Sequence, residues 1–499
     1  MRKSKIDFLS LLAIILVVSS AGAQEISKTA STFHYSVTVP KDNIRTAQVE
    51  AHVVLRKGQL LMAPWGYPPA LENGWGSFVE DLQVFSDGKR LNTQREKGGI
   101  WQVDAPDGTA LTLRYTVHLT HDDHNWDPAG GIDARPAVVE DALFYVTKAL
   151  FIYSDEEAAD ATITFQLPDG WVVSSPWTVL PDKPNHWRAG NLTSLINNAL
   201  VLGKHLVSEV EDGSMTVILA VDPALKEDLP IFFETLSLQL SAYRKIFGKT
   251  PDERFLITLR RDAVNDGEAF TSSFNQVFLY TDLSQRKIVW ASTFGHELFH
   301  YWNGAGRIQG TDHRFTEWFS EGFTEYYASL TLVRTGIVPV ELWYKKLEIY
   351  MSRFFVTRNM FPGDKPSLVE AGMDKQHNWL LIYGGGASVA LMLDIEIRSI
   401  TDGQKSLDNV MRLMDKRFGD TGKTYTTKDV LAIVNEVSGQ DFTNFFEQYV
   451  MGNSGLPPFE KTLAKVGLRL NQFADEYYIN ILEQPSPRQK ALLSGLMGK

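Results

Sequence analysis

The hydrophobic pattern of this chain is strand-like from about Phe33 to Val207 and changes after about Asp222, and that change restricts the fold classes that the chain can adopt. Before it, short segments alternate apolar and polar residues with the period of two that is typical of β-strands. Turn sequences such as Pro106-Asp107-Gly108 separate these segments. After the change, residues 236–247 have an amphipathic helical pattern, and helical patterns dominate from Trp290 onward. The strand-like segments are 33–39, 51–55, 111–117 and 161–165. We therefore predict an α+β multidomain protein that begins with an antiparallel β domain.

The first residues have the layout of a secretory signal peptide. A cationic start, Met1-Arg2-Lys3-Ser4-Lys5, precedes an apolar stretch at 8–18 and the small residues Ala21-Gly22-Ala23. The apolar stretch is shorter than the roughly 20 residues that a transmembrane helix needs. We expect cleavage after Ala23 and a secreted or periplasmic protein, with an uncleaved anchor as the alternative. Because no second apolar run of that kind follows, we expect no stable membrane span after cleavage.

The amino-acid composition restricts the binding partners and the types of metal ligand that this chain can have. The net charge is −11, from 49 basic and 60 acidic residues. No cluster of Lys and Arg stands out, so nucleic acid is not an expected partner. The chain has no cysteine, which excludes disulfides and thiolate metal sites. Any metal must therefore be held by histidine and carboxylate side chains.

The segment His296-Glu297-Leu298-Phe299-His300 contains the pattern His-Glu-x-x-His. On a helix, residues four apart lie on one face, so both imidazoles can bind one cation. Glu297 points to one side of the helix face that carries the two imidazoles. From there its carboxylate can reach a water at the metal but not the metal itself. This arrangement predicts a hydrolase in which Glu297 is the general base. A pair of histidines on a helix surface is the alternative.

A catalytic zinc site needs a third protein ligand and an open position. Glu317, Glu321 and Glu325 recur every four residues in a second helical segment and share one of its faces. We predict Glu321 as the third ligand, and Glu325 as the group that orients His296 through its other ring nitrogen. One Zn²⁺ per chain is expected, although cobalt or manganese would accept similar ligands.

These two segments together resemble the glycyl aminopeptidase family of gluzincin zinc metallopeptidases. The resemblance rests on 296–303 and 318–327, and extends to Ile382-Tyr383-Gly384-Gly385-Gly386 and to 417–422 with 445–450. It implies a thermolysin-like catalytic domain behind an N-terminal β domain, and an aminopeptidase that favours small N-terminal residues, Gly or Ala. By that match Tyr383 would donate a hydrogen bond to the tetrahedral oxyanion; a core aromatic is the alternative for this residue.

The sequence departs from the family pattern at three places. The family carries a Gly-rich strand near the substrate amine, and here the corresponding stretch is 265–274. Glu268 is our candidate for binding the amine, with an exposed loop residue as the alternative. Gly385 stands where the family usually has lysine, and too few residues remain for the family's C-terminal PDZ domain. A zinc endopeptidase and a non-catalytic module that binds peptides or proteins therefore remain as alternative functions.

The expected organisation follows from these assignments, since 499 residues exceed what one core usually supports. The signal peptide covers 1–23 and the N-terminal β domain 24–207. The zinc catalytic domain covers 208–335 and a helical domain 336–470, and the pattern assigns no structure to the tail at 471–499. The expected substrate is a peptide or protein.

Overall fold

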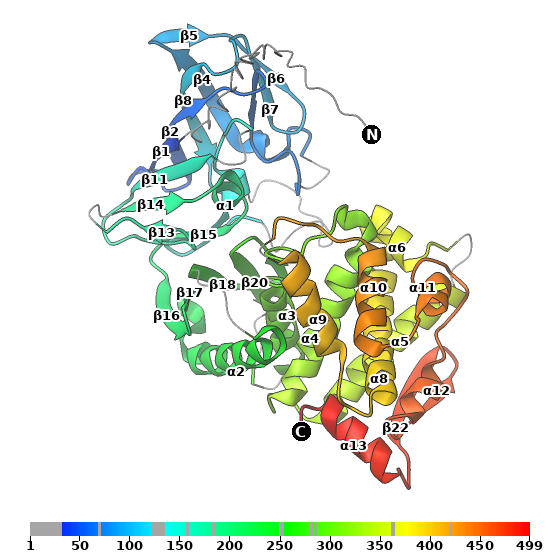
Figure 1. Ribbon diagram of the computed structural model, residues 1–499. Helices are drawn as coiled ribbons and strands as arrows, with labels where there is room; N and C mark the ends of the chain where they lie inside the picture. The colour runs from blue at the N-terminus through cyan, green and yellow to red at the C-terminus, as the bar shows by residue number, and fades with distance from the viewer. Residues whose placement is uncertain are drawn as a thin grey trace, which may run out of the picture. The chain divides into compact units, whose positions relative to one another are not determined.

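The computed structural model describes residues 32–67, 71–121, 135–155, 159–181, 185–248, 254–279, 283–284, 287–360, 365–419 and 421–499. Ser31–Lys499 form one compact unit. The signal peptide expected at 1–23 lies outside the described residues. The α+β multidomain class is confirmed, with a β-rich N-terminal part followed by mixed and then helical parts (Figure 1).

The largest sheet of the N-terminal part has eight strands in the order β13-β14-β11-β1-β2-β8-β4-β5. Side chains along β2 alternate between buried and exposed, as the period of two predicts. β1 and β11 are parallel, so the sheet is mixed, whereas an antiparallel domain was expected. The strands are β1 (Thr32–Thr38), β2 (Thr46–Val54), β4 (Val79–Ser86), β5 (Lys89–Leu91), β8 (Ala110–His118), β11 (Asp160–Gln166), β13 (Thr178–Val179) and β14 (His186–Ala189).

Two smaller sheets and a short helix complete the N-terminal part. One sheet has the order β3-β7-β6 and the other β12-β15-β10-β9. β10 and β15 are buried along their whole length. The elements are β3 (Gln59–Leu61), β6 (Thr93–Glu96), β7 (Ile100–Val103), β9 (Ala137–Val139), β10 (Ala142–Val146), β12 (Val172–Ser174), β15 (Ala199–Gly203) and α1 (Leu192–Ile196).

A five-stranded sheet separates the N-terminal core from the helical core. Its order is β16-β17-β18-β20-β19, with the middle three strands parallel and the two edge strands antiparallel to them. Ile218 and Leu256 pack with the N-terminal core, while Val217 and Phe255 pack with the helices. The domain boundary expected at residue 207 falls inside β16. The strands are β16 (Leu206–Asp212), β17 (Met215–Val221), β18 (Arg254–Asp262), β19 (Asp266–Ala269) and β20 (Ser273–Leu279).

Helices from 229 to 464 form the rest of the core, and two of them approach very closely. A Cβ added to Gly322 in α4 would lie 2.4 Å from the Cα of Gly386 at the start of α8, so only glycine permits this crossing. The helices are α2 (Leu229–Phe247), α3 (Lys287–Phe299), α4 (Glu317–Arg334), α5 (Val340–Asn359), α6 (Leu368–Ala371), α7 (Lys375–Leu380), α8 (Gly386–Ile400), α9 (Leu407–Phe418), α10 (Thr427–Ser438), α11 (Thr443–Tyr449) and α12 (Phe459–Ala464).

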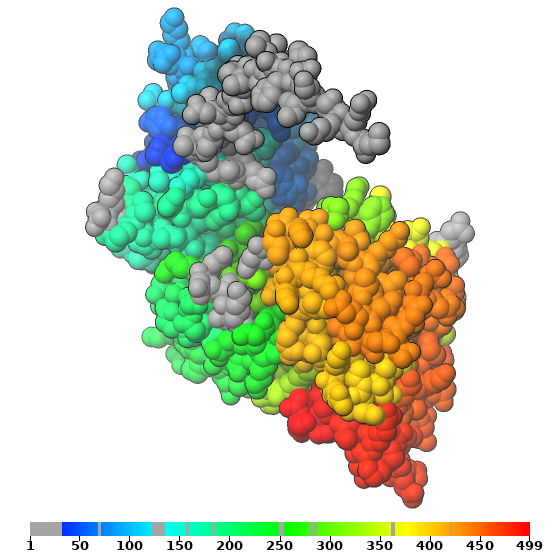
Figure 2. Space-filling model, viewed as in Figure 1, coloured from blue at the N-terminus to red at the C-terminus, as the bar shows by residue number. Residues whose placement is uncertain are grey.

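The C-terminal stretch, to which the pattern assigned no structure, is ordered. It contains the hairpin β21 (Leu468–Phe473) and β22 (Glu476–Ile481), followed by α13 (Pro487–Leu496). The backbone N–H of Ile479 donates to Glu348 of α5 at 2.8 Å, which ties the hairpin to that helix. Ser486 and Gln489 form a capping box at the start of α13. Figure 2 shows this segment, in red, at the surface beside the yellow and orange helices.

One helical segment in the described part of the chain, Leu368–Ile400, is long and apolar enough to cross a membrane by length and composition. Its mean hydropathy is 1.6, and 83% of the window is buried inside the protein. That burial is the environment of a core helix in a folded domain. The segment carries α8, which packs against α4 beside the site described next.

Candidate metal centre and substrate cleft

Helix α3 carries His296 near its C-terminal end, and His300 follows directly after the helix, with both side chains buried. The hydroxyl of Tyr243 in α2 donates to the carbonyl of Gly295 at 2.7 Å and so fixes the helix just before the motif. His296 and His300 are 6% and 8% exposed. Their Nε2 atoms lie 3.0 Å apart. The four-residue spacing has therefore brought both imidazoles to one point, as the helix period predicts.

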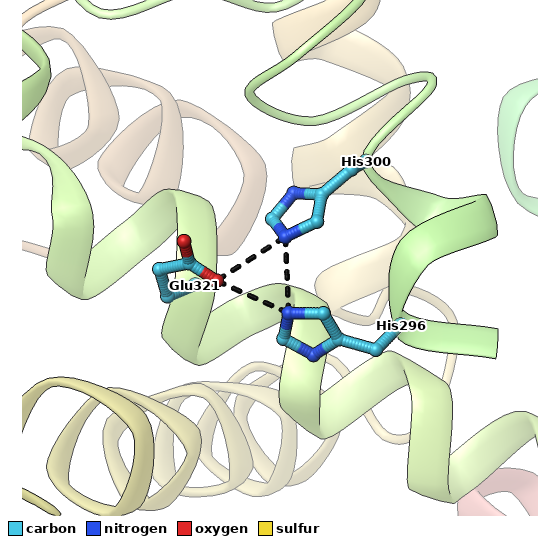
Figure 3. Close-up of side chains that lie close together, drawn as sticks. All are labelled: His296, His300 and Glu321. Atoms are coloured by element: carbon cyan, nitrogen blue, oxygen red, sulfur yellow. Dashed lines mark hydrogen bonds and ion pairs between the residues drawn. The ribbon is translucent and has the colours of Figure 1, made fainter. Parts of the chain in front are cut away.

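Helix α4 brings Glu321 to the same point. Its Oε2 lies 3.1 Å from Nε2 of His296 and 3.2 Å from Nε2 of His300 (Figure 3). These three side chains form a group whose donor atoms lie close enough to hold one metal ion. Two imidazole nitrogens and one carboxylate oxygen are the donor set of a catalytic zinc site, so the residues fit that ion.

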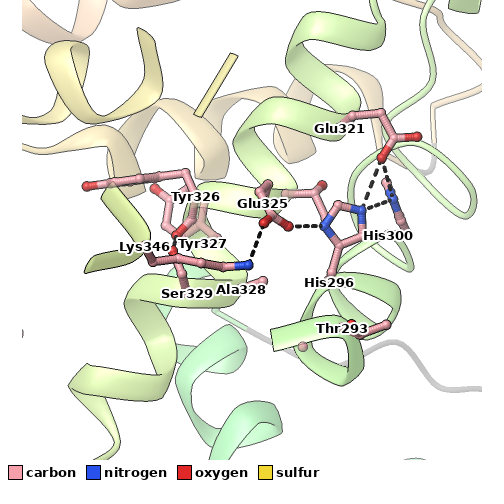
Figure 4. A network of polar contacts seen from close by, with 12 residues as sticks. Thr293, His296, His300, Glu321, Glu325, Tyr326, Tyr327, Ala328, Ser329 and Lys346 are labelled. Carbon is pink, nitrogen blue, oxygen red and sulfur yellow. Dashed lines mark hydrogen bonds and ion pairs between the residues drawn. The ribbon is translucent and has the colours of Figure 1, made fainter. Parts of the chain in front are cut away.

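The other nitrogen of each imidazole ring has its own partner. Nδ1 of His296 lies 3.0 Å from Oε2 of Glu325 (Figure 4), which is the contact that the sequence predicted. Nδ1 of His300 lies 2.8 Å from the backbone carbonyl of Asn303. Such contacts place the proton on Nδ1 and leave Nε2 free to bind a metal. The bond to Asn303 was not predicted, because sequence patterns do not reveal backbone acceptors.

Glu325 is itself held on its far side. Tyr350 donates to its Oε1 at 2.7 Å, and Nζ of Lys346 lies 2.9 Å from the same oxygen; Figure 4 shows the Lys346 contact. Burial opposes the charge on this carboxyl, but Lys346 and the bond to His296 outweigh burial and lower its pKa. Glu325 therefore stays ionised and keeps the ring of His296 oriented.

The electrostatic environment of the site favours a positive charge between the three donors. Burial disfavours the charged form of His296, yet its hydrogen bonds to Glu321 and Glu325 raise its pKa to about 10. Burial raises the pKa of Glu297 to about 7, although the two histidines act in the opposite direction.

Glu297 lies against the edge strand β19. A Cβ added to Gly267 would be only 2.7 Å from Cγ of Glu297, so the absence of a side chain at Gly267 makes room for the carboxylate. Both residues line a cavity of about 480 Å³. The remaining lining residues are Asp266, Glu268, Ala269, His296, His300, Gly304, Ala305, Gly310, His313, Glu317, Ser320, Glu321, Lys375 and Tyr383.

Tyr383 reaches this cavity from a single π-helical turn, Leu381–Gly385, between α7 and α8. Such turns interrupt a helix and often occur at functional sites. The ring of Tyr383 stacks on that of His296, with centroids 5.8 Å apart. Burial, followed by the charge of Glu321, raises the pKa of Tyr383 well above its ordinary value. Its hydroxyl therefore stays protonated and able to donate a hydrogen bond.

Glu268 lies on β19 and not on a loop, with its side chain 30% exposed. Its Oε1 lies 2.8 Å from Nζ of Lys148, which belongs to the N-terminal part. Asp266 is two residues away on the same strand and lines the cavity as well. Burial, and then the charge of Glu268, raise the pKa of Asp266, while the backbone N–H of Gly267 acts against them.

Three charged residues at the site were not predicted. Nζ of Lys375 in α7 lies 2.5 Å from Oε1 of Glu321 and 2.9 Å from Oε2 of Glu317. Asp266 could have been found, because strand periodicity puts it on the same face as Glu268. Lys375 and Lys148 reach the site through tertiary packing alone, and no local pattern indicates them.

Comparisons with known proteins agree with this geometry. The profile of the peptidase M61 N-terminal domain matches residues 34–204, and that of the M61 glycyl aminopeptidase matches 289–381. Together the two matches cover more than half of the chain. No curated protein matches the chain significantly.

Several solved structures share the fold at low sequence identity. An aminopeptidase N family protein from Idiomarina loihiensis has a TM-score of 0.71 at 18% identity, over 88% of this chain and 79% of that one. Leukotriene A4 hydrolase from Saccharomyces cerevisiae has a TM-score of 0.55 at 15% identity, over 88% and 70%. An M1 zinc metallopeptidase from Deinococcus radiodurans has a TM-score of 0.51 at 16% identity, over 86% and 95%.

The fold and the His-Glu-x-x-His site, with Glu321 on the adjacent helix, define a peptidase, an enzyme that hydrolyses peptide bonds. The chain belongs to the M61 glycyl aminopeptidase family. The family match supports an aminopeptidase, and the donor set of the site fits zinc.

Proposed function

We propose that this protein is an exported zinc aminopeptidase that removes small N-terminal residues, Gly or Ala, from peptides. The observation that carries the proposal is the convergence of His296, His300 and Glu321 at one point of a cavity that Glu297 also lines. In this proposal the three converging residues hold one Zn²⁺. When bound, zinc supplies Lewis-acid catalysis by polarising the peptide carbonyl and lowering the pKa of water.

Glu297 carries the proton in the proposed reaction. Its carboxylate accepts a proton from the attacking water, and then donates it to the amine nitrogen of the leaving peptide. Its position in the cavity, beside the three converging donors, is what both halves of that cycle require. The close contact with Gly267 restricts where the carboxylate can lie.

Tyr383 stabilises the negative charge that develops on the carbonyl oxygen. It lines the same cavity as Glu297, and its hydroxyl stays protonated. A donor that is held in place before the reaction needs no reorganisation when the charge appears. In the same proposal Asp266 and Glu268 form the end of the cleft that binds the substrate's N-terminal ammonium.

A zinc endopeptidase is the second candidate. The ion pair between Glu268 and Lys148 favours it, because one oxygen of the proposed ammonium-binding carboxylate already has a cationic partner. An endopeptidase needs no free α-ammonium, so a peptide with an acetylated N-terminus separates the two functions. Export rests on the sequence of residues 1–23 and is tested by locating the protein and determining its mature N-terminus.

The deciding experiment compares the wild type with Glu297→Gln for zinc content and for hydrolysis of glycyl and alanyl chromogenic amides, free and N-acetylated. We expect one zinc in both proteins and turnover of the free amides by the wild type. General acid–base catalysis contributes on the order of 10²–10⁴-fold, so Glu297→Gln should lose about that much in kcat. Cleavage of acetylated peptides would favour the endopeptidase. Zinc without turnover would favour a binding role, and no zinc would refute the proposal.

A further inference from the structure

The side of the cleft formed by the edge strand β19 contains an ion pair that joins the N-terminal part to that strand. Lys148 follows β10 in the sequence, and its Nζ lies 2.8 Å from Oε1 of Glu268, 120 residues further on. The Lys148 side chain is only 4% exposed, whereas that of Glu268 is 30% exposed and lines the cavity. The cation is therefore buried, whereas the carboxylate that it pairs with lines the cavity.

The surroundings of Lys148 keep its ammonium in place. It lies over the ring of Trp75 at 5.4 Å and over that of Phe270 at 5.1 Å. A cation between two aromatic faces is stabilised by the negative potential of the rings. A Cβ added to Gly66 would be 3.4 Å from Nζ, so the backbone closes the pocket on another side. The ammonium of Lys148 is therefore held in a fixed position beside the cleft by the surrounding rings and backbone.

The pair determines how much negative charge this end of the cleft presents. Asp266 and Glu268 face the cavity from one strand, and Lys148 cancels one of their two formal charges. The group then carries one net negative charge, which matches one substrate ammonium. A substrate whose first residue is lysine or arginine brings two positive charges to this end, and, once the first is paired, the described residues of β19 offer the second no carboxylate without a cationic partner.

We propose that Lys148 is a specificity-determining residue that, by pairing with Glu268, selects peptides with an uncharged first side chain over peptides with a basic one. This rests on the proposed aminopeptidase function, because the ammonium-binding end is where the pair lies. The proposal gives a physical reason for a preference for uncharged over basic N-terminal residues that does not depend on the size of the cavity.

The test compares two substrates that differ only in charge, the chromogenic amides of lysine and norleucine, whose side chains share the same four-carbon chain. Two unit charges about 7 Å apart at an effective dielectric constant near 20 interact by about 2.4 kcal/mol, which corresponds to a change in a rate ratio of on the order of 50-fold. We therefore expect Lys148→Met to raise the lysine-to-norleucine ratio of kcat/KM by on the order of 50-fold. Lys148→Arg keeps the cation and should leave that ratio as in the wild type.

Two further variants separate charge from packing. Glu268→Gln removes one negative charge while Lys148 stays, so the ratio should fall below that of the wild type. The double variant Lys148→Met/Glu268→Gln has the same net charge as the wild type at this end, and its ratio should return toward the wild-type value. A purely structural role of Lys148 would change both substrates equally in every variant, and that result would overturn the proposal.

Binding of lysinamide and norleucinamide, measured by calorimetry on the zinc-loaded protein, provides a readout that needs no turnover. A lysinamide-to-norleucinamide affinity ratio that rises in Lys148→Met supports the inference, even if wild-type turnover is absent and the proposed function fails. If the wild type turns over both amides and Lys148→Met has the same lysine-to-norleucine ratio of kcat/KM, this inference is wrong while the proposed aminopeptidase function stands.

Discussion

The two ends of the cleft are assembled from different parts of the chain. At the metal end, His296, His300, Glu321 and Glu325 come from two adjacent helices and span only 29 residues. At the other end, β19 leads into a turn held by the side chain of Asn198 and the backbone N–H of Ala199, each 74 residues away in sequence from its partner. Glu268 is held by Lys148 from 120 residues away. The metal end depends on helix periodicity, whereas the ammonium end depends on packing between the N-terminal part and the five-stranded sheet.

This difference implies that the two ends can be altered separately. Substitutions in the N-terminal part should change which substrate is bound and leave the metal donors in place. Substitutions within α3 and α4 should change metal binding or proton transfer, and affect all substrates alike. The predictions below test that separation.

Gly267→Ala should have the largest effect, because Gly267 is where the two ends touch. The new Cβ would lie 2.7 Å from Cγ of Glu297, so the carboxylate must move. A displacement of a catalytic group by about 1 Å can cost on the order of 100-fold in rate. We expect a loss of about that size in kcat with zinc content unchanged, measured by steady-state kinetics and metal analysis.

Gly190→Ala is the matched control, because a Cβ there meets no atom within 4 Å. It should behave as the wild type. If Gly267→Ala kept full activity, the position of Glu297 would not be set by β19, and the two ends would be independent even at their contact.

Glu325→Gln should have the next largest effect, and only at the metal end. The amide keeps the shape but loses the charge that orients His296 through Nδ1. Loss of such a partner typically costs about 10–100-fold in metal affinity or activity. Competition with a chelator should show weaker zinc binding, while the lysine-to-norleucine ratio stays constant. Glu341→Gln, an exposed position on α5, is the control; a changed substrate ratio in Glu325→Gln would contradict the separation.

The sequence alone predicted the residues of the metal end, because their arrangement depends on spacing within single helices. A four-residue spacing on a helix fixes which side chains share a face, so the pair His296 and His300, and the helix face that carries Glu321, could be predicted before any tertiary contact was known. The strands at 33–39 and 111–117 were predicted for the same kind of reason, since burial on one face imposes a period of two.

The rest depended on contacts that no local pattern encodes. The parallel pairing of β1 with β11 depends on where the chain returns after more than a hundred residues, and side-chain alternation is the same for either direction. Lys148 and Lys375 look like ordinary lysines in the sequence, and only the fold places them beside Glu268 and Glu321. The C-terminal hairpin has few buried residues, so its hydrophobic pattern is weak.

Asn198→Ala should have the smallest effect, and at the ammonium end. The fully buried side-chain oxygen of Asn198 accepts from the backbone N–H of Ser272 and from the hydroxyl of Ser273, each at 2.9 Å. These bonds fix the turn between β19 and β20 to the N-terminal part. Leaving buried polar groups without partners costs about 1–3 kcal/mol, so we expect the free energy of unfolding to fall by about that amount.

Because the turn supports β19, KM for alanyl amides should rise in Asn198→Ala while zinc affinity does not change. Asn444→Ala is the control, since that amide bonds to Gln448 within α11. Denaturant titration, steady-state kinetics and chelator competition measure the three quantities on the same samples. A loss of stability with KM unaltered would show that β19 keeps its place without this anchor. A parallel loss of zinc affinity would show that the N-terminal part also supports the metal end, and the separation of the two ends would fail.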